Sequence, residues 1–171
     1  KALVKSDPIQ SYLNEINRTH AAQIAGAFSN VLWQSLPLKG LAPQEPAAHA
    51  FKITQHSHEL TAPEKSRGPS VIIGFDERPS SPDIITGVAS ALRRNGCRVI
   101  DLGLTVPAIM SYATTHLQAQ GAIMVTGSQC GPSYTGLEFL QENSQPVSAG
   151  HGLEKIQEII RTGFGRASRQ P

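Results

Sequence analysis

The sequence predicts an α/β fold, in the form of a three-layer α/β/α domain with a mostly parallel four-stranded sheet. Two observations predict this fold. Continuous apolar segments at 71–75 and 121–125 are typical of strands that are covered on both faces. Between them lie segments whose apolar residues recur every three or four positions, as in amphipathic helices. This alternation with short connections favours parallel strands, right-handed crossovers and helices over the sheet.

The composition fits one globular domain over residues 1–171. The length is close to the roughly 150 residues of an average domain, and 39% of the residues are hydrophobic. The net charge is only +2 and no basic stripe is present, so we expect no nucleic-acid partner. The two cysteines, Cys97 and Cys130, cannot form a disulfide framework and fit a reducing, cytoplasmic compartment. Because no apolar run approaches the roughly 20 residues of a membrane helix, we expect no membrane partner.

The first expected helix covers about 20–33. Its apolar residues follow helical spacing, Thr19 stands where an N-cap would, and Leu36 is pushed out of helical geometry by the proline that follows it. Residues 1–18 show no clear pattern.

Residues 37–70 hold five prolines and three of the six histidines and show no periodicity, so they are predicted to form a long surface insertion. His56 and His58 could suggest a metal site. An exposed polar loop is favoured, because no cysteine or carboxylate frames the pair.

Regular alternation begins at the strand 71–75. The next helix is expected to begin with Ser81 as N-cap and Pro82 as first helical residue, and to end at Asn95-Gly96. The remaining expected elements are strands at 97–100, 121–125 and 137–140, a helix that begins at Pro107, and a helix from Leu153 that stops near Gly163.

Ligands of open α/β sheets bind beyond the carboxyl ends of the strands. Three loops are predicted to lie at that edge, at 76–81, 102–107 and 126–136. The third is long, rich in glycine and hydroxyl groups, and follows a buried strand. Small residues let its backbone N–H groups approach a phosphate, and Ser128 is the hydroxyl placed to react. The alternative is an ordinary turn whose serines satisfy local backbone groups.

Other catalytic patterns are absent or weak. A hydrolase elbow needs glycines two positions before and after the serine, where this chain has Thr126 and Cys130. The sequence has neither a P-loop nor a dinucleotide fingerprint. Cys130 has no nearby histidine or arginine in the sequence to activate it, so an incidental thiol is favoured. Asp76 and Arg78 could contact a ligand or form an ion pair that braces the loops, and His116 is expected on a helix surface.

Three segments resemble the first domain of the α-D-phosphohexomutases, the phosphoglucomutase/phosphomannomutase family. VIIGFDERPSS (71–81) is similar to the family's strand followed by Gly-x-Asp-x-Arg-x-Ser-Ser, and NGCRVIDLG (95–103) is similar to its second strand. AIMVTGS (122–128) resembles the phosphoserine loop, usually written Thr-Ala-Ser-His-Asn-Pro. The continuation YTGLEF (134–139) resembles a Tyr-Asn-Gly-Leu-Lys-Phe-like run. The likeness covers about 71–168.

The resemblance implies that Ser128 carries a phosphoryl group. The serine would give this group to a sugar phosphate of glucose or mannose and recover one from the other hydroxyl, so that 1- and 6-phosphates interconvert through a bisphosphorylated intermediate. Thr126, Gly127 and Gln129 would belong to the loop that contacts the substrate phosphate. Mg²⁺ would bind Ser128 through its phosphate, with most ligands from another domain, and a glucose 1,6-bisphosphate-type activator is implied.

The sequence departs from the family at Gln129, Cys130 and Gly131, where the motif has His, Asn and Pro. Glutamine can hydrogen-bond a phosphate but cannot exchange a proton near neutral pH. The family's Arg-Gly segment is not found near the N-terminus. The expected partners are a sugar phosphate and other domains of the same polypeptide, without which this domain is expected to be inactive.

One alternative is a catalytically degenerate domain of the same fold that binds sugar phosphates or regulates. A third possibility, an unrelated flavodoxin-like phosphate binder, would not explain three ordered motifs.

Overall fold

The computed structural model describes residues 9–12, 16–36, 68–131 and 134–163. All but the last three residues of the predicted insertion at 37–70, with its histidines, lie outside these ranges. The described elements are β1 (Ile9–Tyr12), α1 (Arg18–Ser35), β2 (Ser70–Phe75), α2 (Ser81–Arg94), β3 (Arg98–Leu104), α3 (Pro107–His116), β4 (Gly121–Val125), β5 (Tyr134–Gln141), the 3₁₀ turn η1 (Glu142–Ser144) and α4 (Leu153–Thr162).

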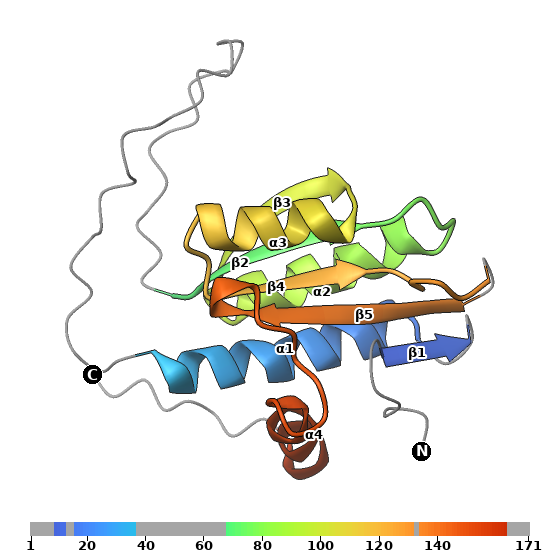
Figure 1. Ribbon diagram of the computed structural model, residues 1–171. Coiled ribbons are helices and arrows are strands. Elements are labelled where there is room, and N and C mark those ends of the chain that lie inside the picture. The colour runs from blue at the N-terminus through green and yellow to red at the C-terminus, as the bar shows by residue number, and fades with distance from the viewer. Residues whose placement is uncertain (1–8, 13–15, 37–67, 132–133, 164–171) are drawn as a thin grey trace.

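The described strands form one sheet in the order β1-β5-β4-β2-β3 (Figure 1). β2 pairs in parallel with both β3 and β4, while β5 is antiparallel to β4 and to β1. The predicted α/β fold is confirmed, and the four predicted strands are mostly parallel. The structure adds a fifth strand, β1, from the segment in which the sequence shows no clear pattern.

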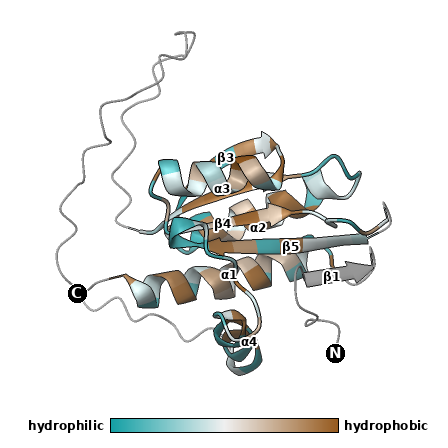
Figure 2. Ribbon diagram, in the orientation of Figure 1, coloured by the Kyte–Doolittle hydropathy of each residue, from teal (hydrophilic) through white to brown (hydrophobic). Residues whose placement is uncertain are grey.

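Helices cover both faces of the sheet, so the domain has three layers (Figure 1). Alternate residues of each central strand enter different cores. Val71 and Ile73 of β2 pack with α1, α2 and α4, whereas Ile72 packs with Met110 of α3. In the larger core the rings of Phe28 and Phe139 are 5.0 Å apart. Apolar residues dominate the central strands, as expected for strands buried on both faces (Figure 2).

Two predicted helix starts are wrong by one or two residues. Asn17 caps α1, because its Oδ1 accepts the backbone N–H of His20 at 2.9 Å, and Thr19 lies inside the helix. Asparagine caps helices better than threonine, which favours the earlier start. Ser81 is the first residue of α2 and not its cap. Its hydroxyl donates to Asp76 Oδ1 at 2.7 Å instead, which ties the helix start to the preceding loop.

The second predicted strand is longer than expected. β3 continues to Leu104, so the predicted loop at 102–107 shrinks to two residues. The pairing of β2 with β3 changes register opposite Gly74, and Gly103 adopts a φ of +66° there. This bulge needs a left-handed residue, which glycine supplies without strain, and the strand therefore continues past it. The stops at Gly96 and Gly163, both with positive φ, agree with the prediction. In the described parts of the chain, no helix combines the length and the apolarity that crossing a membrane requires.

Candidate functional site

Two of the predicted loops meet at the carboxyl edge of the sheet because β2 and β4 are neighbours. Phe75 lies opposite Val125, and the backbone N–H of Asp76 donates to the Val125 carbonyl at 3.0 Å. The loop after β2 and the loop after β4 therefore leave the sheet side by side. The site forms where these two loops meet.

The Arg78 guanidinium holds the two loops together. Its Nε donates to Asp76 Oδ2 at 2.8 Å, and its other N–H groups donate to four backbone carbonyls of the second loop. These are the carbonyls of Gly131 at 2.7 Å, Tyr134 at 3.1 Å, Ser128 at 3.0 Å and Cys130 at 3.0 Å. Because a guanidinium has five N–H donors, all of them are engaged within the protein. Of the two roles considered for Asp76 and Arg78, the structure supports the bracing ion pair.

Asp76 is the carboxylate that pairs with Arg78. Besides Arg78 Nε, its carboxylate accepts the Ser81 hydroxyl and the backbone N–H groups of Arg78 at 3.2 Å and Gly127 at 3.3 Å. Partial burial acts to raise the pKa of Asp76. Hydrogen bonds from Ser81, Thr126 and Arg78 outweigh it, so that the pKa lies below its ordinary value. Asp76 is therefore ionised at neutral pH and balances the charge of Arg78, and both side chains are largely buried, at 19% and 12% exposure.

Gly127 allows the second loop to close around Arg78. A Cβ at this position would lie 2.5 Å from the Tyr134 carbonyl oxygen and 2.6 Å from Arg78 Cζ, closer than atoms can approach. The resembled motif has alanine here. In this chain the loop and the guanidinium pack more closely than an alanine would allow.

Ser128 is held by its backbone while its side chain is exposed. Its N–H donates to Thr126 Oγ1 at 2.9 Å, its carbonyl accepts from Arg78, and its φ is +49°. A left-handed conformation costs a non-glycine residue about 1–2 kcal/mol. The Cys130 N–H to Gly127 carbonyl bond of 3.0 Å closes the turn around it. The loop thus presents one strained, exposed serine on a fixed backbone.

The other predicted site residues fall into two groups. Thr126 is buried, and its hydroxyl bonds to groups within the loops, while Gly127 is buried against Arg78. Gln129, next to Ser128, is exposed. Of these four residues, only Ser128 and Gln129 therefore expose their side chains to solvent, whereas Thr126 and Gly127 are buried and fix the conformation of the loop.

Two further residues were considered from the sequence as reactive groups, His116 on α3 and Cys130 in the second loop. His116 is exposed on α3, as expected, and stacks on Tyr112 with ring centroids 5.2 Å apart. Cys130 is half-buried in the second loop. In the ranges that the structure describes, no group of three or more His, Cys, Asp or Glu residues could hold a metal ion. With the Asp76 oxygens already hydrogen-bonded, these residues do not build a magnesium site on their own.

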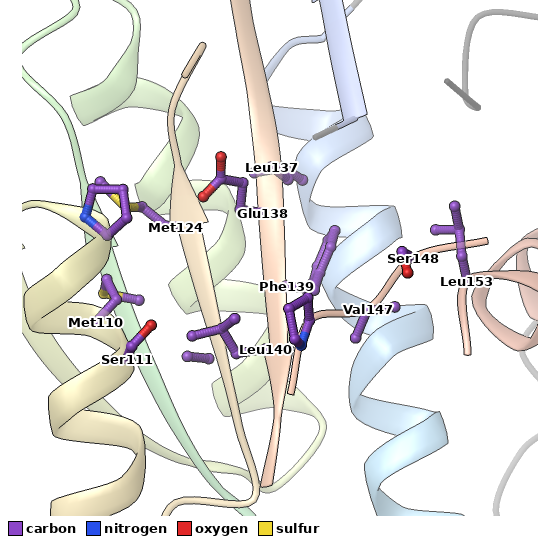
Figure 3. Close-up of a pocket in the computed structure, with 13 residues that line it drawn as sticks. Met110, Ser111, Met124, Leu137, Glu138, Phe139, Leu140, Val147, Ser148 and Leu153 are labelled. Atoms are coloured by element: carbon purple, nitrogen blue, oxygen red, sulfur yellow. The ribbon is translucent and has the colours of Figure 1, made fainter. Parts of the chain in front are cut away.

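Glu138, near the carboxyl edge of the sheet, was not among the predicted site residues. It lies on β5 opposite Met124, and Met124 precedes Thr126 by two residues. Its side chain lines a largely apolar pocket of about 250 Å³ between α3, β5 and the segment 146–148 (Figure 3). The signal was present in the sequence, since the resembled run YNGLKF has lysine where this chain has Glu138. A carboxylate therefore replaces a cation beside the carboxyl edge of the sheet.

Comparison with known proteins shows which family the chain is similar to. Residues 38–166 match the family model "Phosphoglucomutase/phosphomannomutase, alpha/beta/alpha domain I". A phosphoglucomutase/phosphomannomutase of Thermococcus kodakarensis is 32% identical over 130 residues, which are 75% of this chain and 27% of that protein. A protein of Xanthomonas campestris described as phosphohexose mutases is 34% identical over 99 residues, 58% of this chain and 22% of its own.

The solved structures support the same fold. A phosphoglucomutase/phosphomannomutase family protein of Burkholderia thailandensis superimposes with a TM-score of 0.66 at 20% identity, over 94% of this chain and 30% of that one. The chain spans about a fifth to a quarter of the length of the curated relatives named above. The family match over most of the chain shows that this chain belongs to the phosphoglucomutase/phosphomannomutase family and contains its α/β/α domain I.

Proposed function

We propose that this chain is the phosphoserine-bearing domain of a phosphohexomutase, with Ser128 as the phosphoryl carrier. The observation that carries the proposal is the position of Ser128. It is an exposed hydroxyl on a backbone fixed from both sides, at the carboxyl edge of parallel strands. A covalent carrier needs access to its substrate and a defined direction of attack, and this loop offers both.

The proposed reaction has two balanced halves. First, a hydroxyl oxygen of a glucose or mannose phosphate attacks the phosphorus of phosphorylated Ser128. The bond from phosphorus to Ser128 Oγ breaks, and the oxygen takes up the proton that the sugar hydroxyl loses. Then Ser128 Oγ attacks the other phosphate of the bisphosphorylated sugar, whose departing oxygen receives the serine proton. Each half exchanges one P–O bond for another, so the serine ends phosphorylated again.

The residues around Ser128 fix the backbone and supply little proton-transfer chemistry. Gln129 can donate a hydrogen bond to a phosphate oxygen but has no titratable group. We expect the acid–base groups, the sugar-contacting groups and most ligands of a magnesium ion to come from other domains of the same polypeptide. A bisphosphorylated sugar of the glucose 1,6-bisphosphate type would load Ser128 at the start.

Turnover by the full protein tests this proposal. We expect conversion of glucose 1-phosphate or mannose 1-phosphate to the 6-phosphate, lost in Ser128→Ala and retained in Ser90→Ala, an exposed serine on α2. The 171-residue chain alone is expected to be inactive. Turnover in Ser128→Ala at the wild-type rate would contradict the assignment of the carrier.

A second candidate is a domain that binds sugar phosphates without transferring phosphate. It is favoured by Gln129, which replaces the histidine of the resembled motif and has no titratable group. Glu138, which replaces a lysine of the resembled run, is expected to weaken phosphate binding in either candidate. A carboxylate near a phosphate opposes its binding by like-charge repulsion. If Glu138 acts in this way, Glu138→Lys should tighten glucose 6-phosphate binding several-fold, measured by calorimetry. The exposed Glu142→Lys serves as the matched control. Wild-type protein that binds but is never phosphorylated would favour this candidate.

A further inference from the structure

The loop that carries Ser128 is organised around one cation from another part of the chain. Four of its carbonyls, within residues 128–134, converge on Arg78, which lies 50 to 56 positions earlier. The loop's own backbone bonds include two short turns, Cys130 N–H to the Gly127 carbonyl and Tyr134 N–H to the Gly131 carbonyl. Carbonyls without a partner are costly at a partly buried site. The shape of the loop therefore depends on the guanidinium.

We infer that Arg78 is the positioning residue for phosphoryl transfer at Ser128, an inference that rests on the proposed function. Arg78 holds the Ser128 carbonyl while Thr126 Oγ1 holds its N–H, and these two bonds keep the serine in its left-handed conformation. The conformation of the backbone decides where the side-chain hydroxyl points. Arg78 thus sets the direction of attack without touching the substrate.

The same geometry separates this role from direct phosphate binding. Arginines in phosphate sites usually point free N–H groups at the ligand. Arg78 has none to spare, since its five donors serve Asp76 and the four carbonyls. The side chain is also only 12% exposed. Loss of Arg78 should therefore lower the rate of transfer and leave the affinity for the phosphoryl donor unchanged.

Lysine in place of Arg78 separates charge from geometry. Arg78→Lys keeps the positive charge beside Asp76, but an ammonium has only three donors and lacks the planar fork that reaches several carbonyls. Arg94→Lys, an exposed position in the last turn of α2, is the matched control. Both variants are made in the full protein.

The first measurement is amide hydrogen exchange of the loop. In Arg78→Lys the amides of Gly127, Ser128 and Cys130 are expected to exchange about tenfold faster or more, because bonds to a charged group are lost. Ile72 and Ile123 in the buried strands should change little, and Arg94→Lys should match the wild type throughout. Unchanged loop exchange in Arg78→Lys would overturn the inference, whether or not Ser128 is ever phosphorylated.

The second measurement is phosphorylation of Ser128 by glucose 1,6-bisphosphate. We expect the maximal rate to fall at least about tenfold in Arg78→Lys with an unchanged half-saturating donor concentration, because only positioning is lost. In Arg78→Ala, millimolar guanidinium should restore part of the rate and ammonium should not. A raised half-saturating concentration at an unchanged maximal rate would show direct donor contact and overturn the inference. A wild-type protein that is never phosphorylated would refute the proposed function and leave the exchange result to decide the role of Arg78.

Discussion

Asp76→Asn is expected to destabilise the fold far more than an exposed Asp→Asn change does. The carboxylate accepts bonds on both oxygens, two on Oδ1 and two on Oδ2, besides its charge pairing with Arg78. Asparagine offers one acceptor oxygen and turns an NH₂ group toward the remaining donors. Because hydrogen bonds to charged groups contribute about 1.5–3 kcal/mol each, and the pair is not fully buried, we expect a loss of about 3 kcal/mol.

The assay is urea unfolding followed by the fluorescence of Trp33, the only tryptophan of the chain. Its indole N–H donates to the Asn95 carbonyl at 2.9 Å, so the signal reports the contact between α1 and α2. Asp83→Asn is the matched control. It removes an exposed ion pair with Arg18, both side chains being 57% exposed, and should cost at most about 1 kcal/mol.

The difference in the free energy of unfolding between wild type and Asp76→Asn should depend on pH. The pKa of Asp76 in the folded protein lies below its ordinary value of 3.8, so its stabilising effect is fully present above that pH. The effect is lost as the pH falls through the folded-state pKa. The gap between wild type and Asp76→Asn should therefore be constant near neutral pH and narrow in acid. An Asp76→Asn cost no larger than that of Asp83→Asn, or a gap independent of pH, would refute the reasoning.

Three further changes test the packing of the site. Gly127→Ala should lower the free energy of unfolding by about 1–3 kcal/mol, since its Cβ would overlap Arg78 and the Tyr134 carbonyl, and urea titration measures the loss. Gly131→Ala in the same loop, whose Cβ would meet no described atom within 4 Å, should stay within about 0.5 kcal/mol, and equal costs would contradict the close packing. Ser128→Gly should be more stable than Ser128→Ala by about 1 kcal/mol in thermal unfolding, because glycine relieves the positive φ, and the reverse order would argue against strain at this position. Thr135→Val should raise stability by up to about 1 kcal/mol in urea, because in the described part of the chain the buried Thr135 hydroxyl has no hydrogen-bond partner; a loss of stability would indicate a partner.

The elements that the sequence predicted well are those with strong local signals. β4 has the predicted bounds, and α4 starts and stops as predicted, because a continuous apolar run and a glycine at positive φ after the last turn are local features. β1 has no comparable signal. It forms by pairing four residues with the free edge of β5, and such pairing depends on tertiary context more than on the strand's own residues.

The sequence identified residues of the candidate site but not the contacts between them. The sequence placed Ser128 on a loop at the carboxyl edge and offered two roles for Asp76 and Arg78. The choice between those roles needs the strand order, because only the pairing of β2 with β4 brings Arg78 to carbonyls about fifty residues away. The predicted N-cap role of Ser81 was wrong for the same reason, since its hydroxyl bonds to Asp76 in the site instead of to its own helix.

The central claim is that Ser128 carries phosphate, and the intact mass of the protein tests it most directly. After incubation of the full protein with glucose 1,6-bisphosphate, we predict a mass increase of one phosphoryl group, absent from Ser128→Ala and present in Ser90→Ala. No phosphate on the wild type, or a phosphate that persists in Ser128→Ala, would contradict the account.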